Sequence, residues 1–343
     1  ACDECPVDGI QVSNACRGCL AHRCKDNCPK DAISIIDHKA VIDKEKCIEC
    51  GKCMAVCPYS AIVKHTRPCV NACKPQAIHI DQNTEKAVID KEKCISCGAC
   101  VYRCPFGALS DKSFILDAIK MLKNCDRVYA VVAPAIVSQF TYAKPGQVIT
   151  AIKALGFCDV LEAALGADMV AYNEAAELAE RGFLTSSCCP AFVNMIRKHF
   201  PRLQANVSTT VSPMVALSRW VREKYPQAKV VFIGPCVAKK TEQVEGGPDY
   251  VLTTEEIVAM MDARKIDPDK MEADPVQESS TYGKGFASSG GVTSAVMQVI
   301  QEMGEVPQVS AQRCNGAAEC KKALMMLQAG KFDMDFIEGM ACE

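Results

Sequence analysis

The sequence predicts two domains. The first is an α+β domain over residues 1–110, built from two modules at about 1–62 and 63–110, and the second is an α/β domain with parallel sheets over residues 111–343. Three observations predict this. Sixteen of the 24 cysteines lie in the first 104 residues, short strand patterns alternate with them, and long helical patterns separated by continuous apolar runs follow. A chain of 343 residues is long enough to bury two cores.

Composition and charge exclude several classes of function. A net charge of -2 gives no reason to expect nucleic acid or an anionic membrane as a partner. The longest apolar runs are too short to span a bilayer. The first residues show no basic stretch followed by an apolar one, so we expect no secretion signal and a cytoplasmic protein. A secreted disulfide scaffold also fits poorly, because such chains are short and this one continues into ordinary globular sequence.

Two cysteine runs carry the first functional prediction. Each reads C-x2-C-x2-C-x3-C-P, which is the bacterial ferredoxin run for [4Fe-4S] clusters. Zinc is the competing metal for C-x2-C pairs, but the third cysteine of the loop and the Cys-Pro favour a cluster. The runs are Cys47, Cys50, Cys53 and Cys57, and Cys94, Cys97, Cys100 and Cys104.

An internal repeat and short strands complete the pattern of this domain. Residues 40–62 match residues 87–109 at an offset of 47, which indicates a duplication. Strand patterns at 32–37, 39–43, 77–81 and 86–90 flank short helices expected after each Cys-Pro. The first domain is therefore predicted to be ferredoxin-like.

Sixteen thiolates suffice for four cubanes. In a two-cluster ferredoxin the two halves exchange their last cysteine. The fourth set below requires the N-terminus to fold back, and the alternative for Cys2 and Cys5 is a flexible terminus. The predicted sets are Cys16, Cys19, Cys24 and Cys57; Cys47, Cys50, Cys53 and Cys28; Cys94, Cys97, Cys100 and Cys73; and Cys2, Cys5, Cys69 and Cys104.

In the second domain, cysteine loops follow predicted strands. Residues 127–134 and 228–235 are apolar runs that end in proline, as expected of buried parallel strands. Sites in such sheets form beyond the carboxyl ends of the strands. Three loops contain cysteines there, and together they supply three or four thiolates: Cys188 and Cys189, Cys236, and Cys342.

These loops resemble a known family. Residues 185–190, 234–242 and 338–342 resemble the three signature loops of [FeFe]-hydrogenases, and the ferredoxin-like front end is similar too, so the resemblance covers nearly the whole chain. It implies an α/β hydrogenase catalytic domain that holds an H-cluster, in which a [4Fe-4S] cubane is bridged to a 2Fe subsite with CO, cyanide and azadithiolate ligands. By motif position, Cys189, Cys236 and Cys342 resemble cubane ligands, Cys188 the proton-relay thiol and Lys239 the lysine that grips a cyanide.

In that family the third loop continues to one more cysteine, which bridges the cubane and the 2Fe subsite. We therefore expect the polypeptide to continue beyond Glu343 to this ligand. The alternative is a chain that ends here with a degenerate site, in which Cys314 or Cys320 substitutes. We expect those two to be ordinary buried thiols.

The resemblance also implies a proton path to Cys188. Glu174, Glu177 and Arg181 are spaced three and four residues apart on one helix face, and Ser208 follows in the chain. The alternative is a solvated helix face with a salt bridge. All four positions match the family's path in register, which favours the proton route.

Further positions match the pocket that holds the cofactor in the family. Three others depart from the best-studied members: Gly234 stands where they have Met, Ala135 where they have Ser, and Phe192 where they have Trp. The matching positions are Ala133, Pro134, Ser212, Pro235, Phe286, Ser288 and Met340.

The sequence thus predicts an [FeFe]-hydrogenase that reversibly reduces protons to H2. Its partners would be protons and H2, an external ferredoxin-like electron carrier, and the maturation proteins that insert the 2Fe subsite. The alternatives are a non-catalytic iron–sulfur relative and an H2-sensing relative. The presence of Cys188, Glu174, Glu177 and Lys239 argues against the first, and the presence of the relay thiol Cys188 argues against the second.

Overall fold

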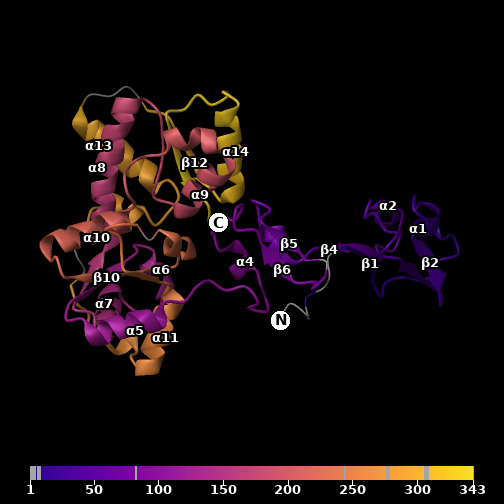
Figure 1. Ribbon diagram of the computed structural model, residues 1–343, viewed down its shortest axis with the longest axis horizontal. Coiled ribbons are helices and arrows are strands. Elements are labelled where there is room, and N and C mark those ends of the chain that lie inside the picture. Colours follow the sequence, from indigo (N-terminus) through magenta and orange to yellow (C-terminus); the bar gives the residue numbers. More distant parts are fainter. Residues whose placement is uncertain are drawn as a thin grey trace. The chain divides into compact units, whose positions relative to one another are not determined.

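The computed structural model describes Cys5 and residues 9–81, 83–242, 244–275, 279–304 and 309–342. The chain forms two compact units (Figure 1), one from Ala1–Lys91 and Ala99–Ser110 and the other from Glu92–Gly98 and Asp111–Glu343. Residues 92–98 lie inside the first domain predicted from sequence. They pack in the second unit because Ile95, only 1% exposed, is buried among its apolar side chains.

The first unit contains three two-stranded antiparallel ladders. Four of these strands coincide with the strand patterns seen in the sequence. The pairing of β1 with β4 was not anticipated, and it brings together the chain segments on either side of residues 13–61. The ladders are β1 (Gly9–Val12) with β4 (Ile62–His65), β2 (Ile33–Ile36) with β3 (Lys39–Ile42), and β5 (Ile78–Ile80) with β6 (Ala87–Ile89).

The short helices of this unit precede the last cysteine of each run, so the expectation of helices after each Cys-Pro was wrong. Proline disfavours helical backbone in the residue before it, which ends three of these four helices ahead of a Cys-Pro, while the other is followed by Cys73, Lys74 and then Pro75. Each helix instead contains one cysteine. The helices are α1 (Arg23–Asp26), α2 (Lys52–Ala55), α3 (Pro68–Ala72) and α4 (Ala99–Tyr102).

The second unit is built on two parallel sheets. In the larger one the strand order is β11-β10-β7-β8, and every pairing is parallel. The two apolar runs of the sequence form buried parallel strands, as predicted, and in the sheet they are the two central neighbours. The strands are β7 (Val128–Val132), β8 (Asp159–Glu162), β10 (Lys229–Ile233) and β11 (Tyr250–Leu252).

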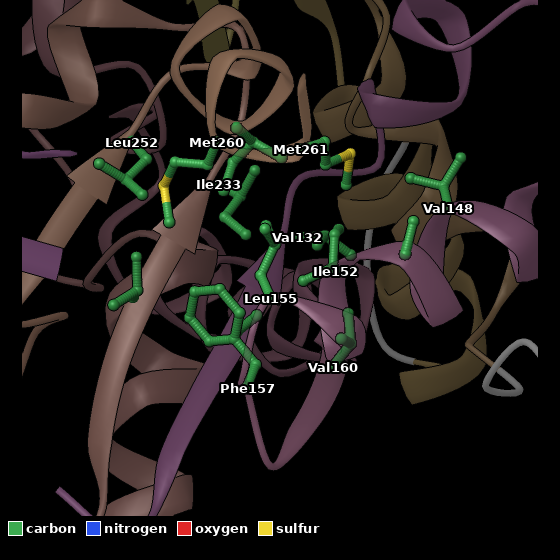
Figure 2. Close-up of a cluster of buried hydrophobic side chains, with 14 of the residues drawn as sticks. Val132, Val148, Ile152, Leu155, Phe157, Val160, Ile233, Leu252, Met260 and Met261 are labelled. Atoms are coloured by element: carbon green, nitrogen blue, oxygen red, sulfur yellow. The ribbon is translucent and has the colours of Figure 1, made fainter. Parts of the chain in front are cut away.

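Helices cover both faces of this sheet. On one face, side chains of the strands, including Val132 and Ile233, pack with Ile152 and Met260 from helices in a single apolar core (Figure 2). On the other face, Phe232 packs with Leu217. The covering helices are α5 (Ile115–Asn124), α7 (Pro145–Ala154) and α11 (Thr254–Arg264) on the first face, and α10 (Pro213–Lys224) on the second.

The smaller sheet has the order β12-β13-β9 and is also parallel. Ile337 packs toward α9 and α14, while Phe336, the preceding residue, packs toward α8 and α13, as alternation along a strand requires. These elements are β9 (Leu184–Thr185), β12 (Ala311–Asn315), β13 (Phe336–Met340), α8 (Ala163–Arg181), α9 (Pro190–His199), α13 (Gly291–Met303) and α14 (Ala317–Gln328).

Shorter elements complete the unit: α6 (Ile136–Gln139), α12 (Thr281–Gly285), η2 (Pro201–Asn206), η3 (Val237–Thr241) and η4 (Pro268–Lys270). Of the helices that the structure describes, none combines the length and the apolar composition that a bilayer crossing requires. The carboxyl ends of the parallel strands lead into the cysteine loops, so the two sheets position the candidate site.

Candidate active site and iron–sulfur ligands

The three cysteine loops of the second unit each begin where a parallel strand ends. Cys188 and Cys189 follow β9, Cys236 follows β10, and Cys342 follows β13. Cys189 is the N-cap residue of α9, and Cys236 is that of η3. Strand and helix together therefore fix the backbone on both sides of these two thiols.

The structure brings Cys189, Cys236 and Cys342 together. Burial raises the pKa of Cys189, and the charge of Cys236 adds to the effect. Burial also raises the pKa of Cys342 to about 11, with further contributions from Cys189 and Cys236. Cys97 also lies near this group. It packs against the same apolar cluster as Cys189 and Cys236, and its charge raises the pKa of Cys342.

This donor set fits an iron–sulfur cubane. Cys189 and Cys236 sit against an apolar cluster, and the three thiols disfavour one another's ionisation, so a cationic cluster that binds them as thiolates relieves both effects. Within the described residues, no three Cys, His, Asp or Glu side chains converge tightly enough to hold a single metal ion. A cubane requires wider spacing, because it separates its ligands by its own width.

Cys188 and Lys239 lie side by side in this site. Burial raises the pKa of Cys188 well above its usual value, and the charges of Glu174 and Cys189 raise it further while Lys239 lowers it. The Lys239 ammonium donates to the Cys188 carbonyl oxygen at 2.9 Å and to Glu242 Oε2 at 3.0 Å. Burial alone lowers the pKa of Lys239, but the charges of Glu242, Cys236 and Cys188 more than offset this and raise it. Lys239 is therefore a charged donor.

Glu174 is a fully buried carboxyl on α8 that faces the loop carrying Cys188. Its Oε1 accepts from the backbone N–H of Ser187 at 3.1 Å and lies 3.3 Å from the Ser187 hydroxyl. Burial raises its pKa to about 7, although hydrogen bonds from Ser187 and Ser208 oppose the shift. A carboxyl with this pKa gives and takes protons near neutral pH.

Glu177, one turn further along α8, has a different environment. It accepts from the Ser208 hydroxyl at 2.8 Å, from the Thr209 backbone N–H at 3.0 Å and from Arg181 at 2.6 Å. Burial tends to raise its pKa, but these hydrogen bonds lower it overall. Arg181 also donates to the carbonyl of Ala205. Glu177 is anionic at neutral pH. The Ser208 hydroxyl donates to Glu177 and lies near Glu174, whose buried Oε2 has no hydrogen-bond partner within the described residues.

Four of the predicted pocket residues lie in places that suit a ligand contact. Ala133 and Pro134 follow the carboxyl end of β7. The Ser212 hydroxyl is buried and has no hydrogen-bond partner within the described part of the chain, which fits a polar group in the pocket. Phe286 and Cys188 pack against the same apolar cluster.

The other predicted pocket residues are less enclosed. Pro235 and Ser288 are exposed, and Ser288 turns its hydroxyl toward the Gly285 carbonyl oxygen at 3.0 Å. Met340 ends β13 and is half-buried. Their roles at the cofactor stay predictions.

At two of the positions that depart from the family pattern, the structure shows how neighbouring residues pack around the substituted residue. A Cβ at Gly234 would lie 2.8 Å from the Ala133 Cβ and 3.1 Å from the Phe232 ring, so those side chains occupy the space of a larger residue. Phe192 is fully buried with its ring against the backbone of Gly339.

The sequence interpretation missed two residues of the site. Ser187 contacts Glu174 through both its backbone N–H and its hydroxyl, and its position directly before Cys188 was the available signal. Glu242 forms an ion pair with Lys239, three residues away on η3. Cys314 and Cys320 are buried in the core beside α14, as expected of ordinary thiols.

In the first unit the structure brings together members of three predicted ligand sets. In each set, burial raises the pKa of one cysteine and two other members add to the shift through their charge. Cys2 lies outside the described residues. The groups are Cys24 with Cys19 and Cys57, Cys53 with Cys47 and Cys50, and Cys69 with Cys5 and Cys104.

The four cysteines that follow the short helices of the first unit have one feature in common. Each sulfur accepts a hydrogen bond from the backbone N–H four residues later, at 3.1–3.4 Å, in Cys28, Cys57, Cys73 and Cys104. Such N–H donors stabilise a thiolate in a cluster. The remaining predicted set is Cys73, Cys94, Cys97 and Cys100. Its members divide between the two units, so this set stays a prediction, as does the role of Cys16.

Comparison with known proteins agrees with this arrangement. A family described as iron only hydrogenase large subunit, C-terminal domain, matches residues 126–343, and two 4Fe-4S dicluster domain families match residues 15–61 and 39–105. Iron hydrogenase 1 of Clostridium pasteurianum is 30% identical over 91% of this chain and 61% of its own length. The NADP-reducing hydrogenase subunit HndD of Solidesulfovibrio fructosivorans is 27% identical over 75% of this chain and 43% of its own. The chain thus spans only part of these relatives.

The solved structure of [FeFe]-hydrogenase HydA1 from Chlamydomonas reinhardtii has a TM-score of 0.57 at 22% identity. The match covers 67% of this chain and 82% of that one, and it shows the shared fold. The predicted fold class, a ferredoxin-like front end followed by a hydrogenase domain with parallel sheets, is confirmed. The chain belongs to the iron-only, or [FeFe], hydrogenase large-subunit family.

Proposed function

We propose that this protein interconverts protons and electrons with H2 at an H-cluster held in its second unit. One observation carries the proposal. The half-buried thiol of Cys188 lies close to a charged ammonium, Lys239, and to a fully buried carboxyl, Glu174, next to three converging cysteines. A protein that only stores or passes electrons needs the cysteines but has no use for the other three groups.

Cys189, Cys236 and Cys342 would hold the cubane, since their thiols converge and disfavour one another's charge until irons bind them. When bound, the diiron subsite supplies the redox and Lewis-acid chemistry. Lys239 presents a charged donor held by Glu242, which suits the anionic nitrogen of a cyanide ligand.

The proton route would run from Arg181 and Glu177 through Ser208 to Glu174 and on to Cys188. Arg181, Glu177 and Ser208 are joined by hydrogen bonds, and the Ser208 hydroxyl lies near Glu174, whose Oε2 is buried without a partner among the described residues. Ser187 bonds Glu174 and directly precedes Cys188 in the chain. Glu174 changes its protonation near pH 7, and Cys188 stays a neutral thiol that can donate its proton inward.

Electrons would travel through the clusters of the ferredoxin-like domain to or from an external ferredoxin-like carrier. The two dicluster matches and the three groups of converging cysteines support this part of the proposal. The diiron subsite would be inserted by maturation proteins, because no side chain of the site can make CO or cyanide.

The direct test is H2 evolution from a chemical reductant by the protein loaded with the diiron cofactor. The same protein with cubanes only is the control. We expect H2 from the loaded sample alone. A loaded sample that binds H2 without turnover would point to a sensor, and one that neither binds nor releases H2 would point to a non-catalytic iron–sulfur protein.

A further inference from the structure

Glu338 is a buried carboxylate that the proton and electron routes above leave without a role. It lies on β13, is 1% exposed and comes four residues before Cys342. Both of its oxygens accept hydrogen bonds. Oε1 accepts from the Gly290 N–H at 2.8 Å, and Oε2 accepts from the Thr293 N–H at 2.8 Å and from the Thr293 hydroxyl at 2.5 Å.

These donors belong to the first turn of α13. The N-cap residue of this helix is Gly290, which has no side chain to accept from the free N–H groups of that turn. Glu338 accepts from these N–H groups in place of an N-cap side chain. It lies on β13, 45 residues after Thr293 in the sequence. A carboxylate is well suited to this position, because the N-terminus of a helix favours negative charge.

The turn that Glu338 holds is compact. Residues 285–291 fold so closely that a Cβ at Gly291 would overlap the carbonyl of Gly285, and a Cβ at Gly290 would lie 3.1 Å from the Arg313 side chain. Gly290 also has a φ of 89°, which favours glycine. The turn is therefore closely packed, and the hydrogen bonds of Glu338 attach its end to β13.

The two segments joined in this way form different walls of the candidate site. Phe286 belongs to the turn and packs against the same apolar cluster as Cys188. The strand that carries Glu338 leads to Met340 and Cys342. We propose that Glu338 is a positioning residue of the cofactor pocket, and that its carboxylate fixes the glycine turn of residues 285–291 against the third cysteine loop. The inference rests on the proposed function in one respect, namely that the pocket holds the H-cluster.

Glu338→Gln tests the proposal, because it keeps the size of the side chain and replaces one accepting oxygen by an N–H donor. That donor would face a backbone or hydroxyl donor in a buried place. Glu319→Gln is the matched control. Glu319 lies in the first turn of α14, accepts a hydrogen bond from the backbone N–H of Asn315 at 2.9 Å, and is exposed.

In the loaded protein we expect Glu338→Gln to shift or broaden the infrared bands of the CO and cyanide ligands and to lower turnover about 10–100-fold, as for other residues that orient metal ligands. The cubane signal in electron paramagnetic resonance should persist, and Glu319→Gln should match the wild type. Thr293→Val, which removes one donor and keeps the carboxylate, should change the bands in the same direction by less. Unchanged bands and turnover in both Glu338→Gln and Thr293→Val would overturn the proposal.

A second readout separates this inference from the proposed function. Amide hydrogen exchange can be measured in protein that holds cubanes and no diiron subsite. Glu338→Gln should speed exchange at Gly290, at Thr293 and in residues 339–342, and unchanged exchange would refute the positioning role. A wild type without CO or cyanide bands would refute the proposed function, and the exchange result would then decide the role of Glu338 alone.

Discussion

Glu174 and Glu177 are one helical turn apart on α8, yet their environments drive their protonation in opposite directions. Burial raises the pKa of Glu174 to about 7, whereas hydrogen bonds from Thr209, Ser208 and Arg181 outweigh burial at Glu177 and lower its pKa. Two neighbouring carboxyls thus differ in charge at neutral pH. This is the arrangement that acid–base chemistry uses, with one group ready to accept a proton that the other passes on.

The raised pKa of Glu174 predicts a pH dependence. Its carboxyl should be protonated below about pH 7 and ionised above it. The unfolded chain loses this proton near 4.5, so the contribution of Glu174 to stability is complete below 4.5 and disappears as the pH rises through 7. Infrared difference spectra should show a protonated carboxyl band that titrates near 7 and is missing in Glu174→Gln. A band that titrates near 4.5 would show that Glu174 is solvated and is not the buried relay.

Replacement of Cys188 should cause a large loss of H2 turnover. Cys188→Ala should lower H2 turnover about 10²–10⁴-fold, because it removes the proton donor nearest to the site. The cubanes should stay bound, since Cys188 is not among their proposed ligands. Cys125→Ala is the control, because Cys125 follows α5 and packs against the core of the larger sheet. Turnover in Cys188→Ala equal to that of the control would rule out this proton route.

At the scale of elements, the short helix η3 holds two adjacent lysines with different tasks. Lys239 donates to the Cys188 carbonyl, while Lys240 is buried and forms ion pairs with Glu256 at 2.8 Å and Asp111 at 2.6 Å. Lys240 also donates to the carbonyl of Lys112 at 2.8 Å. Because Lys240 is anchored in this way, η3 cannot rotate freely, and Lys239 is held toward the site.

This network predicts a large effect on stability. Lys240→Met would leave two carboxylates without their cation, which should lower the free energy of unfolding by about 3–5 kcal/mol. Lys229→Met is the matched control. Lys229 pairs with Asp249 but its side chain is 46% exposed, so the loss there should stay within about 1 kcal/mol. Denaturant unfolding followed by tryptophan fluorescence measures both, and similar losses would contradict the role given to Lys240.

The elements also show where sequence reasoning fails. The apolar runs that became β7 and β10 were predictable, because strands buried on both faces are continuously apolar. The cap that Glu338 gives to α13 was not predictable. The residues that donate to Glu338 are 45 and 48 positions away in the sequence, and no periodicity connects them with it. The short helices of the first unit were misplaced because the effect of proline on the preceding residue was not weighed.

At the scale of the whole molecule, the cysteine runs predict one cluster for each group of four thiols. Cys69 is 7% exposed, and the structure brings it together with Cys5 and Cys104. Cys69→Ser should therefore remove the signal of one of the four predicted clusters of the ferredoxin-like domain and leave the others. Electron paramagnetic resonance of the reduced protein measures this. Cys158→Ser, at an exposed cysteine outside every run, is the control. Four intact signals in Cys69→Ser would contradict the assignment.

The site itself could be predicted only in part. Cys188, Cys189, Cys236 and Cys342 were found because thiols in loops after strands are rare and chemically distinctive. Ser187 was not, because serine in a loop is common and its contact with Glu174 depends on how α8 packs against that loop. The packing of residues 92–98 in the second unit was also missed, since it depends on contacts of Ile95 with an apolar cluster and of Lys198 and His199 with this segment, about 100 residues apart in the chain.

The central claim is that this fold holds a diiron subsite beside its cubane and works on H2. Infrared spectroscopy of the full-length protein, loaded with the 2Fe cofactor, tests it most directly in the region where metal-bound CO and cyanide absorb. The account predicts bands that shift when H2 is admitted. A protein with intact cubanes and no such bands would contradict it and would be an iron–sulfur protein on a hydrogenase fold.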